Sequence, residues 1–212
     1  MTQNENRRRT GPPSASSVYR AVIEVAGRNG PRRVQRTEVA ELARTDRQFL
    51  RRNWPDVDAL TLLSAEVELD RVLNGVAARV GFSGPSDPAC RLSETLVLAA
   101  RRVREHPVIR ATARTDPGLL SSASVRWDSK LHARAWDWTR TQIQFLEPDR
   151  RRATVALTYQ LFAATLQFAL GQTSGGDDVQ SRIDARLRSL THACLTGTTD
   201  CPSPHEQTYT RP

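Results

Sequence analysis

Hydrophobic residues recur at helical spacing along most of the chain, and no stretch alternates as a half-buried strand requires. In residues 16–30, the side chains of Val18, Val22 and Val25 fall on one face of a helix. Gly30 follows the last of them and is a favourable helix end, because glycine adopts the left-handed conformation without strain. The pattern predicts a first helix that ends at this glycine.

Two shorter helices are predicted next, over residues 36–43 and 46–53. The first has an inner face made of Val39, Ala40 and Ala43. In the second, Asp46 is placed to cap the helix by accepting backbone N–H bonds, and Leu50 points inward. Arg47, Gln48, Arg51 and Arg52 lie on its other faces. Two short helices joined by a tight turn indicate a helix-turn-helix.

The remaining chain reads as a larger bundle of helices. A long amphipathic helix is predicted over residues 55–80. Its inward positions are Leu60, Leu63, Val67, Leu73, Val76 and Val80. Further helices are predicted at 90–105, after Pro107, within 121–146, and at 150–170 and 178–195. The fold class is therefore all-α, with a basic arm (1–17), a small helix-turn-helix domain (18–54), a larger helical domain (55–195) and a disordered tail (196–212).

Charge is concentrated in the first quarter of the chain. The 212 residues include 31 basic and 23 acidic side chains, and the pI is near 10.5. Residues 1–52 hold 12 basic and 5 acidic side chains, whereas the rest of the chain is close to neutral. Such asymmetry favours an anionic partner such as nucleic acid, although an Arg-rich surface without a partner has the same composition.

Residues 18–60 resemble the DNA-binding domain of the tetracycline-repressor (TetR) family. The resemblance rests on Gly30 and on "VAELARTDRQFLRRNWPDVDAL", which keeps the family's spacing without a gap. Three positions depart from the family pattern. Arg44 replaces the turn glycine, Arg51 replaces a tyrosine that contacts phosphate, and Val57 replaces a lysine at the start of the next helix. Asp56 is expected to cap that helix.

The resemblance implies double-stranded DNA as a partner, in the form of a palindromic operator bound by a homodimer. In a helix-turn-helix, the second helix meets base edges in the major groove. Arginine suits guanine and glutamine suits adenine there. For Phe49, contact with a thymine methyl and packing within the small domain are equal alternatives. The candidate DNA-binding residues are Thr37, Arg44, Arg47, Gln48, Phe49, Arg51, Arg52 and Asn53. Arg7, Arg8 and Arg9 are candidates for the backbone or the minor groove.

Aromatic residues gather in the second half of the chain, where the resemblance implies a pocket for a small effector. The candidate effector-binding residues are Trp127, Trp136, Trp138, Phe145, Tyr159 and Phe162. Ordinary core packing is the alternative for each of them. Trp136 and Trp138 cannot both face inward on one helix. A mostly apolar effector is expected, because the surroundings carry few charges.

The sequence offers no basis for catalysis, a cofactor or a metal site. It lacks a nucleophile motif, a phosphate-binding glycine loop and a paired zinc motif. Asp128 and His132 share a helical face, but two ligands are too few for a metal. Cys90, Cys194 and Cys201 are scattered, which indicates reduced thiols in the cytoplasm. No apolar run is long enough for a membrane span or a signal peptide.

The charge pattern and the resemblance together predict a DNA-binding transcriptional regulator. The regulator is expected to be a repressor, which a small-molecule effector releases from its operator. The predicted homodimer forms through the helices at 150–170 and 178–195. Their apolar stripes are Val155, Tyr159, Phe162, Leu166 and Ala169 on the first, and Val179, Ile183, Leu187 and Leu190 on the second. The alternative is that both stripes only cover the core of their own domain. The alternative function is a helical interaction or ligand-carrier protein with weakened or lost DNA binding.

Overall fold

A computed structural model describes residues 14–84, 87–120, 130–145, 154–161, 163 and 177–196, and every regular element among them is helical. The prediction of an all-α fold is confirmed. Most of the predicted basic arm, including Arg7, Arg8 and Arg9, lies outside the described residues. So do the tail beyond residue 196 and the candidate effector residues Trp127 and Phe162, whose side chains are not described.

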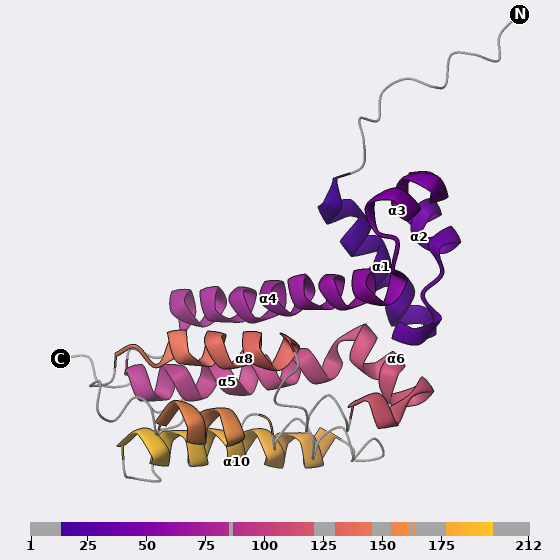
Figure 1. Ribbon diagram of the computed structural model, residues 1–212. Coiled ribbons are helices and arrows are strands. Elements are labelled where there is room, and N and C mark those ends of the chain that lie inside the picture. Colours follow the sequence, from indigo (N-terminus) through magenta and orange to yellow (C-terminus); the bar gives the residue numbers. More distant parts are fainter. Residues whose placement is uncertain are drawn as a thin grey trace, which may run out of the picture.

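The first three helices pack around a small core of their own (Figure 1). They are α1 (Ala15–Asn29), α2 (Arg36–Leu42) and α3 (Arg47–Asn53), with a 3-10 turn at Pro31–Arg33 between the first two. The buried residues are Val18, Ala21, Val22, Val25, Ala26, Val34, Val39, Ala40, Ala43, Leu50 and Leu60. The apolar faces predicted for these helices are therefore confirmed.

Gly30 ends α1 in the left-handed half of backbone space, with φ of 94°. Its N–H donates to the carbonyl of Ala26, 2.9 Å away. A Cβ atom at this position would come 2.4 Å from Oγ1 of Thr115, in a helix far along the chain. Glycine is therefore required here both by the backbone angle and by the close approach of the larger domain.

The long helix α4 (Val57–Ser83) runs from the small domain across the larger one (Figure 1). Asp56 caps it, as predicted, by accepting bonds from Asp58 N at 2.8 Å and Ala59 N at 3.3 Å. Val67, predicted to point inward, is 41% exposed, whereas Glu66 is only 5% exposed. The apolar periodicity fails here because Glu66 binds an arginine of a neighbouring helix, and that ion pair turns the acid inward.

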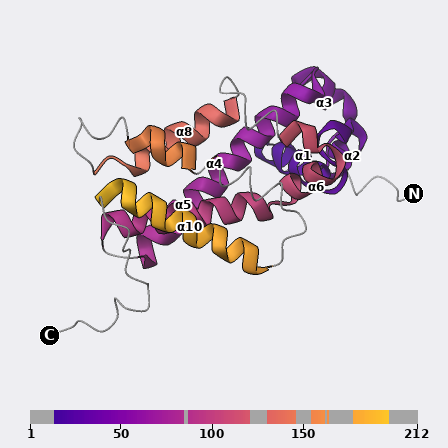
Figure 2. The same ribbon diagram turned by 90° about the horizontal axis from the view of Figure 1, so that it is seen from below.

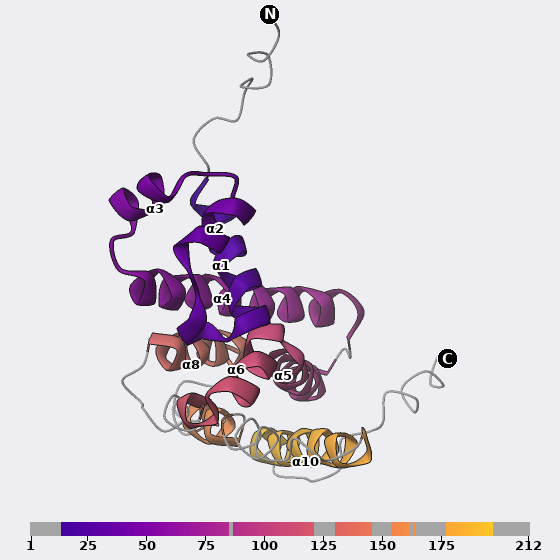
Figure 3. The same cartoon turned by 90° about the vertical axis from the view of Figure 1, so that its right-hand side faces the viewer.

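The larger domain adds α5 (Pro88–Glu105), α6 (Pro107–Thr115), α8 (Lys130–Gln142) and α10 (Asp177–Thr196), with a helical segment at 154–161. Helix α5 lies between α4 and α10, and α8 packs along α4 (Figure 1). Seen from below, α10 lies over α5 (Figure 2). Helix α3 lies at one end of the molecule and α10 at the opposite end (Figure 3). Within the described residues, no helix is both long enough and apolar enough to cross a membrane.

The two stripes predicted to form a dimer interface are partly used inside the protomer. Val155 and Tyr159 are each 3% exposed and Leu187 is 1% exposed, because all three pack into the core of the larger domain. They cannot also line a surface between two chains. Leu157 and Leu190 are exposed by 50% and 37%, and they remain available on the same two helices.

Candidate functional site

The helix-turn-helix is held together by local capping and by one buried leucine. Asp46 caps α3 as predicted, since its carboxylate accepts a bond of 2.6 Å from the backbone N–H of Phe49. Leu50, which is fully buried, fixes the inner face of α3 against α1 and α2. The opposite face of α3 is consequently turned toward solvent.

The turn between α2 and α3 is made by Arg44, where the TetR pattern has glycine. Arg44 has a φ of 52°, and no other non-glycine residue in the described ranges has positive φ. The Thr45 N–H donates to the Ala40 carbonyl at 2.9 Å and the Arg44 N–H donates to the Glu41 carbonyl at 3.2 Å. These two bonds form a Schellman motif around a left-handed residue. The backbone geometry of the turn is kept, and an arginine occupies its tip.

Most of the candidate DNA-binding side chains are exposed. Helices α2 and α3 and the turn between them, which carry these residues, lie at one end of the molecule (Figure 1). The exposed residues are Thr37, Arg44, Arg47, Gln48, Arg51, Arg52 and Asn53. Within the described part of the chain, no ion pair joins Arg44, Arg47 or Arg51 to an acid. Their charge is therefore not neutralised by neighbours, and the surface of α3 is strongly cationic.

Phe49 differs from the other candidates because its ring is half-buried. It packs on the small core and meets Trp54 edge to face, with ring centroids 6.2 Å apart. This favours the packing interpretation of Phe49 over contact with a base. Sequence reasoning missed Arg36, whose guanidinium donates to the carbonyls of Trp54 and Pro55 and so secures the end of α3.

The aromatic candidates of the larger domain fall into different environments. Trp138 is 7% exposed in the core, whereas Trp136 is half-buried, so the two tryptophans do face different ways. Tyr159 meets the ring of Trp136 edge to face at 5.3 Å and that of His132 at 4.7 Å. Phe145 is 46% exposed and is not part of this cluster.

Buried polar atoms in the same part of the core lack partners. Neither Nε1 of Trp138 nor Oγ1 of Thr158 has a hydrogen-bond partner among the described residues. Burial lowers the pKa of His132 and raises the pKa of Tyr159, so both rings are neutral at pH 7. An aromatic core with unpaired donors and no charge suits an uncharged or mostly apolar molecule that accepts hydrogen bonds.

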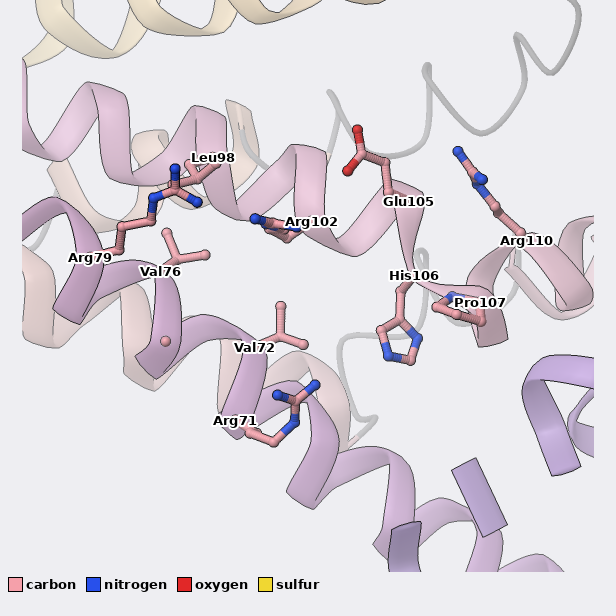
Figure 4. A pocket seen from close by; sticks show the side chains of 11 residues that line it. Arg71, Val72, Val76, Arg79, Leu98, Arg102, Glu105, His106, Pro107 and Arg110 are labelled. Atoms are coloured by element: carbon pink, nitrogen blue, oxygen red, sulfur yellow. The ribbon is translucent and has the colours of Figure 1, made fainter. Parts of the chain in front are cut away.

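A groove of about 550 Å³ opens between α4 and α5, near the start of α6 (Figure 4). Val72, Val76 and Leu98 form its apolar floor. Its polar lining consists of Arg71, Arg79, Arg102, Glu105, His106 and Arg110. The excess of arginines in this lining favours an anion over a cation there.

At one end of this groove, a carboxylate links α4 to the start of α6. Glu68 accepts bonds from Arg71 Nη2 at 2.6 Å and Nε at 2.8 Å, and it lies 3.0 Å from Nε2 of His106. Burial alone raises the pKa of Glu68, but the bonds from Arg71 and His106 outweigh it and lower the pKa to about 2. The carboxylate therefore stays ionised throughout the physiological range.

Helix α6 in turn contacts the small domain. A Cβ atom on Gly27 of α1 would come 3.0 Å from the Cβ of Pro107, and Arg32 Nε lies 2.8 Å from the carboxylate of Asp116. Glu68, His106 and Pro107 thus form a continuous path from α4 to α1. This path could not be predicted from the sequence, because its residues are separated along the chain and His106 lies among arginines.

Comparison with known proteins identifies the fold. No known family profile matches the chain, and no curated protein matches it by sequence. Among solved structures, the TetR-family repressor AlkX from Dietzia sp., implicated in biodegradation of n-alkanes, has a TM-score of 0.60 at 17% identity over 90% of this chain and 100% of its own. RolR in complex with resorcinol has a TM-score of 0.51 at 14% identity, over 89% of this chain and 95% of its own.

A TetR-family transcriptional regulator from Streptomyces coelicolor gives a TM-score of 0.51 at 18% identity, over 86% of this chain and 83% of its own. These likenesses extend over both the helix-turn-helix and the larger domain. They show that the chain has the fold of TetR-family regulators, which confirms the fold that the resemblance implied.

Proposed function

We propose that this protein is a dimeric DNA-binding transcriptional repressor that a small-molecule effector releases from a palindromic operator. The observation that carries the proposal is the exposed face of α3, where Arg47, Gln48 and Arg51 are presented without acidic partners. Guanidinium and amide groups on the second helix of a helix-turn-helix can read guanine and adenine edges in the major groove.

The surroundings of α3 support docking on phosphates. Arg44 at the turn and Arg52 at the end of α3 are both exposed and can contact the DNA backbone on either side of the groove. At the start of α4, Val57 is half-buried in the small core and Asp56 is occupied as a cap. In the TetR family a lysine at this position contacts a phosphate. In this proposal, Arg44 and Arg52 make the phosphate contacts instead.

A gel-shift assay with DNA from around the protein's own gene tests the proposal, with mapping of bound DNA across the genome to find the operator. A repressor binds a two-fold symmetric site with a preference over unrelated DNA. The alternative, an interaction or ligand-carrier protein that has lost DNA binding, shows no preference for any site. Binding that is equally weak on all DNA would support that alternative.

Dimerisation is proposed through the C-terminal helices, with Leu190 of the second predicted stripe and Leu157, which lies outside the first, as its exposed apolar residues. We expect L157E and L190E together to convert a dimer of twice the 23.7 kDa chain mass into a monomer. Light scattering at micromolar concentration measures the mass. The same change at Leu62, which is 40% exposed on α4, is the control and should leave the dimer intact. A wild-type monomer would contradict the proposed assembly.

The effector is proposed to bind in the aromatic core beside Trp136 and Tyr159. The unpaired donors on Trp138 and Thr158 support this position, because buried polar groups normally have partners. In this proposal, effector binding changes the tilt of α4. The movement of α4 is passed to α1 through the contact of Glu68 with the start of α6 and the contact of α6 with α1. Tryptophan fluorescence during ligand screening reports binding, and DNA release can be followed in the same sample. Ligands that bind without changing DNA affinity would contradict the coupling.

The buried hydroxyl of Thr158, which has no hydrogen-bond partner among the described residues, predicts that its removal stabilises the protein. We expect T158V to raise the free energy of unfolding of the ligand-free protein by about 1 kcal/mol, because it removes a buried group that has no hydrogen bond. The control is T139V, since Thr139 is equally buried but its hydroxyl donates to the Ala135 carbonyl at 2.8 Å. That variant should lose about 1 kcal/mol. Urea unfolding measures both, and a loss of stability in T158V would show that its hydroxyl is paired.

A further inference from the structure

Three metal-ligating side chains meet where α5 begins and α10 ends. They are Asp87, Cys90 and His192, and one possible ligand atom from each lies within 4.8 Å of the other two. The two helices that carry Cys90 and His192 are about a hundred residues apart in sequence. This separation explains why the spacing of the cysteines along the chain indicated no metal site.

The burial of the group differs between its members. Cys90 and His192 are only 4% and 5% exposed, whereas Asp87 is exposed. Two ligands are therefore fixed by the packing of α5 on α10, and the third can adjust. A metal bound by all three would keep one position open toward solvent on the side of Asp87.

The carboxylate of Asp87 can act as a ligand without losing its structural role. It caps α5 through Oδ2, which accepts the Cys90 backbone N–H at 2.7 Å. The Cys90 thiol also donates to this carboxylate, and loss of the thiol proton on metal binding would leave a carboxylate oxygen for the cation. The cap also places Cys90 in the first turn of α5, where the helix dipole favours the thiolate that metal binding requires.

We propose that Asp87, Cys90 and His192 bind one Zn²⁺ ion, with water in the fourth position. Thiolate, imidazole and carboxylate are the three ligand types that Zn²⁺ uses in proteins, and the thiolate disfavours Mg²⁺ and Ca²⁺. Ligand atoms around tetrahedral zinc lie about 3.5 Å apart, given bonds of about 2.0–2.3 Å. The upper limit of 4.8 Å is about 1 Å wider, a difference that small rotations of the three side chains on metal binding can close.

The position of the site defines what the metal does. It joins the first turn of α5 to the last turns of α10, where Thr196 Oγ1 lies 3.4 Å from Nδ1 of His192 and can help to orient the ring. Binding fastens the C-terminal helix to the body of the protein. The ion is thus structural, it lies far from α3, and the inference does not depend on DNA binding.

Cobalt substitution of the untagged, full-length protein tests the site. After treatment with a chelator, titration with Co²⁺ should give one thiolate-to-cobalt charge-transfer band that saturates at one ion per chain and disappears when Zn²⁺ is added. Zn²⁺ at a hundred times its Kd should raise Tm by about 5 °C or more. The absence of the band, or a Tm unchanged by Zn²⁺, would overturn the proposal.

Variants assign the ligands. C90S and H192Q should each abolish the charge-transfer band or lower Zn²⁺ affinity at least a hundredfold, and circular dichroism checks that they fold. D87N is the second variant, because asparagine caps a helix as well as aspartate does. It should keep the fold and weaken Zn²⁺ binding about tenfold or more. C194S is the control and should bind as the parent does; a band lost in C194S and kept in C90S would place the metal elsewhere and overturn the assignment.

Discussion

Between 50 and 200 mM salt, the affinity of the protein for its operator is expected to fall about a thousandfold or more. Each phosphate that an arginine neutralises contributes about 0.9 to the slope of log affinity against log salt, and a dimer with six or more such contacts loses this much. The exposed arginines at 44, 47, 51 and 52 supply up to four cations from each protomer. Fluorescence anisotropy with labelled DNA over a series of salt concentrations measures the slope.

Single variants separate phosphate contacts from base contacts. R51A should weaken binding to all DNA and reduce the slope by about 1.8 in a dimer, because each protomer loses one phosphate contact. R47A or Q48A should cost roughly 1–3 kcal/mol and relax the preference at one base pair in each half-site.

The matched control for these variants is R140A. Arg140 is exposed on α8, away from α3, and its guanidinium pairs with the carboxylate of Asp137 at 3.1 Å. R140A removes one arginine, as R51A does, so both variants change the net charge of the protein by the same amount. It should bind DNA as the parent does. Equal losses in R51A and R140A would show that overall charge, and not the surface of α3, attracts the DNA.

The helix-turn-helix could be predicted from sequence because its determinants are local. Asp46 lies next to the helix that it caps, Leu50 is one turn further on, and Gly30 directly follows the helix that it ends. Each signal acts within a few residues, and together they fix the element boundaries. The exposed positions of α3 follow from the same short pattern, so the candidate DNA contacts could be named, apart from Phe49.

The rest of the larger domain depends on polar contacts between distant residues. Periodicity placed Val67 inward, but the pair between Glu66 Oε2 and Arg134 Nε, 3.2 Å apart, buries the acid in its place. An ion pair between residues distant in sequence cannot be recognised from the hydrophobic pattern, because the acid by itself has the character of a surface residue. The same limitation hid the Glu68–His106 path and the group around Cys90.

Helix α10 is fastened to α5 by a buried carboxylate that the sequence did not reveal. Asp184 is 3% exposed, in the middle of the apolar positions of the helix. Oδ2 accepts bonds from Arg101 Nη2 at 2.7 Å and Nε at 3.1 Å, and Oδ1 accepts one from Arg104 Nη2 at 2.6 Å. The Arg104 side chain is itself only 8% exposed, so the carboxylate is needed to neutralise a buried charge.

Removal of this carboxylate is therefore expected to be strongly destabilising. D184A should lower the free energy of unfolding by about 3–5 kcal/mol, because Arg104 is left buried without its partner. For a chain of this length, such a loss lowers Tm by roughly 6–20 °C. Thermal unfolding followed by circular dichroism measures the change, with the chain concentration held constant.

Two further variants show whether burial causes the effect. Asp178 lies on the same helix and pairs with Arg182, but both side chains are 75% exposed, so D178A should cost about 1 kcal/mol or less. In the D184A background, R104M removes the stranded charge and should recover part of the lost stability. Similar losses in D178A and D184A, or no recovery in the double variant, would show that the buried pair does not hold α10 on α5.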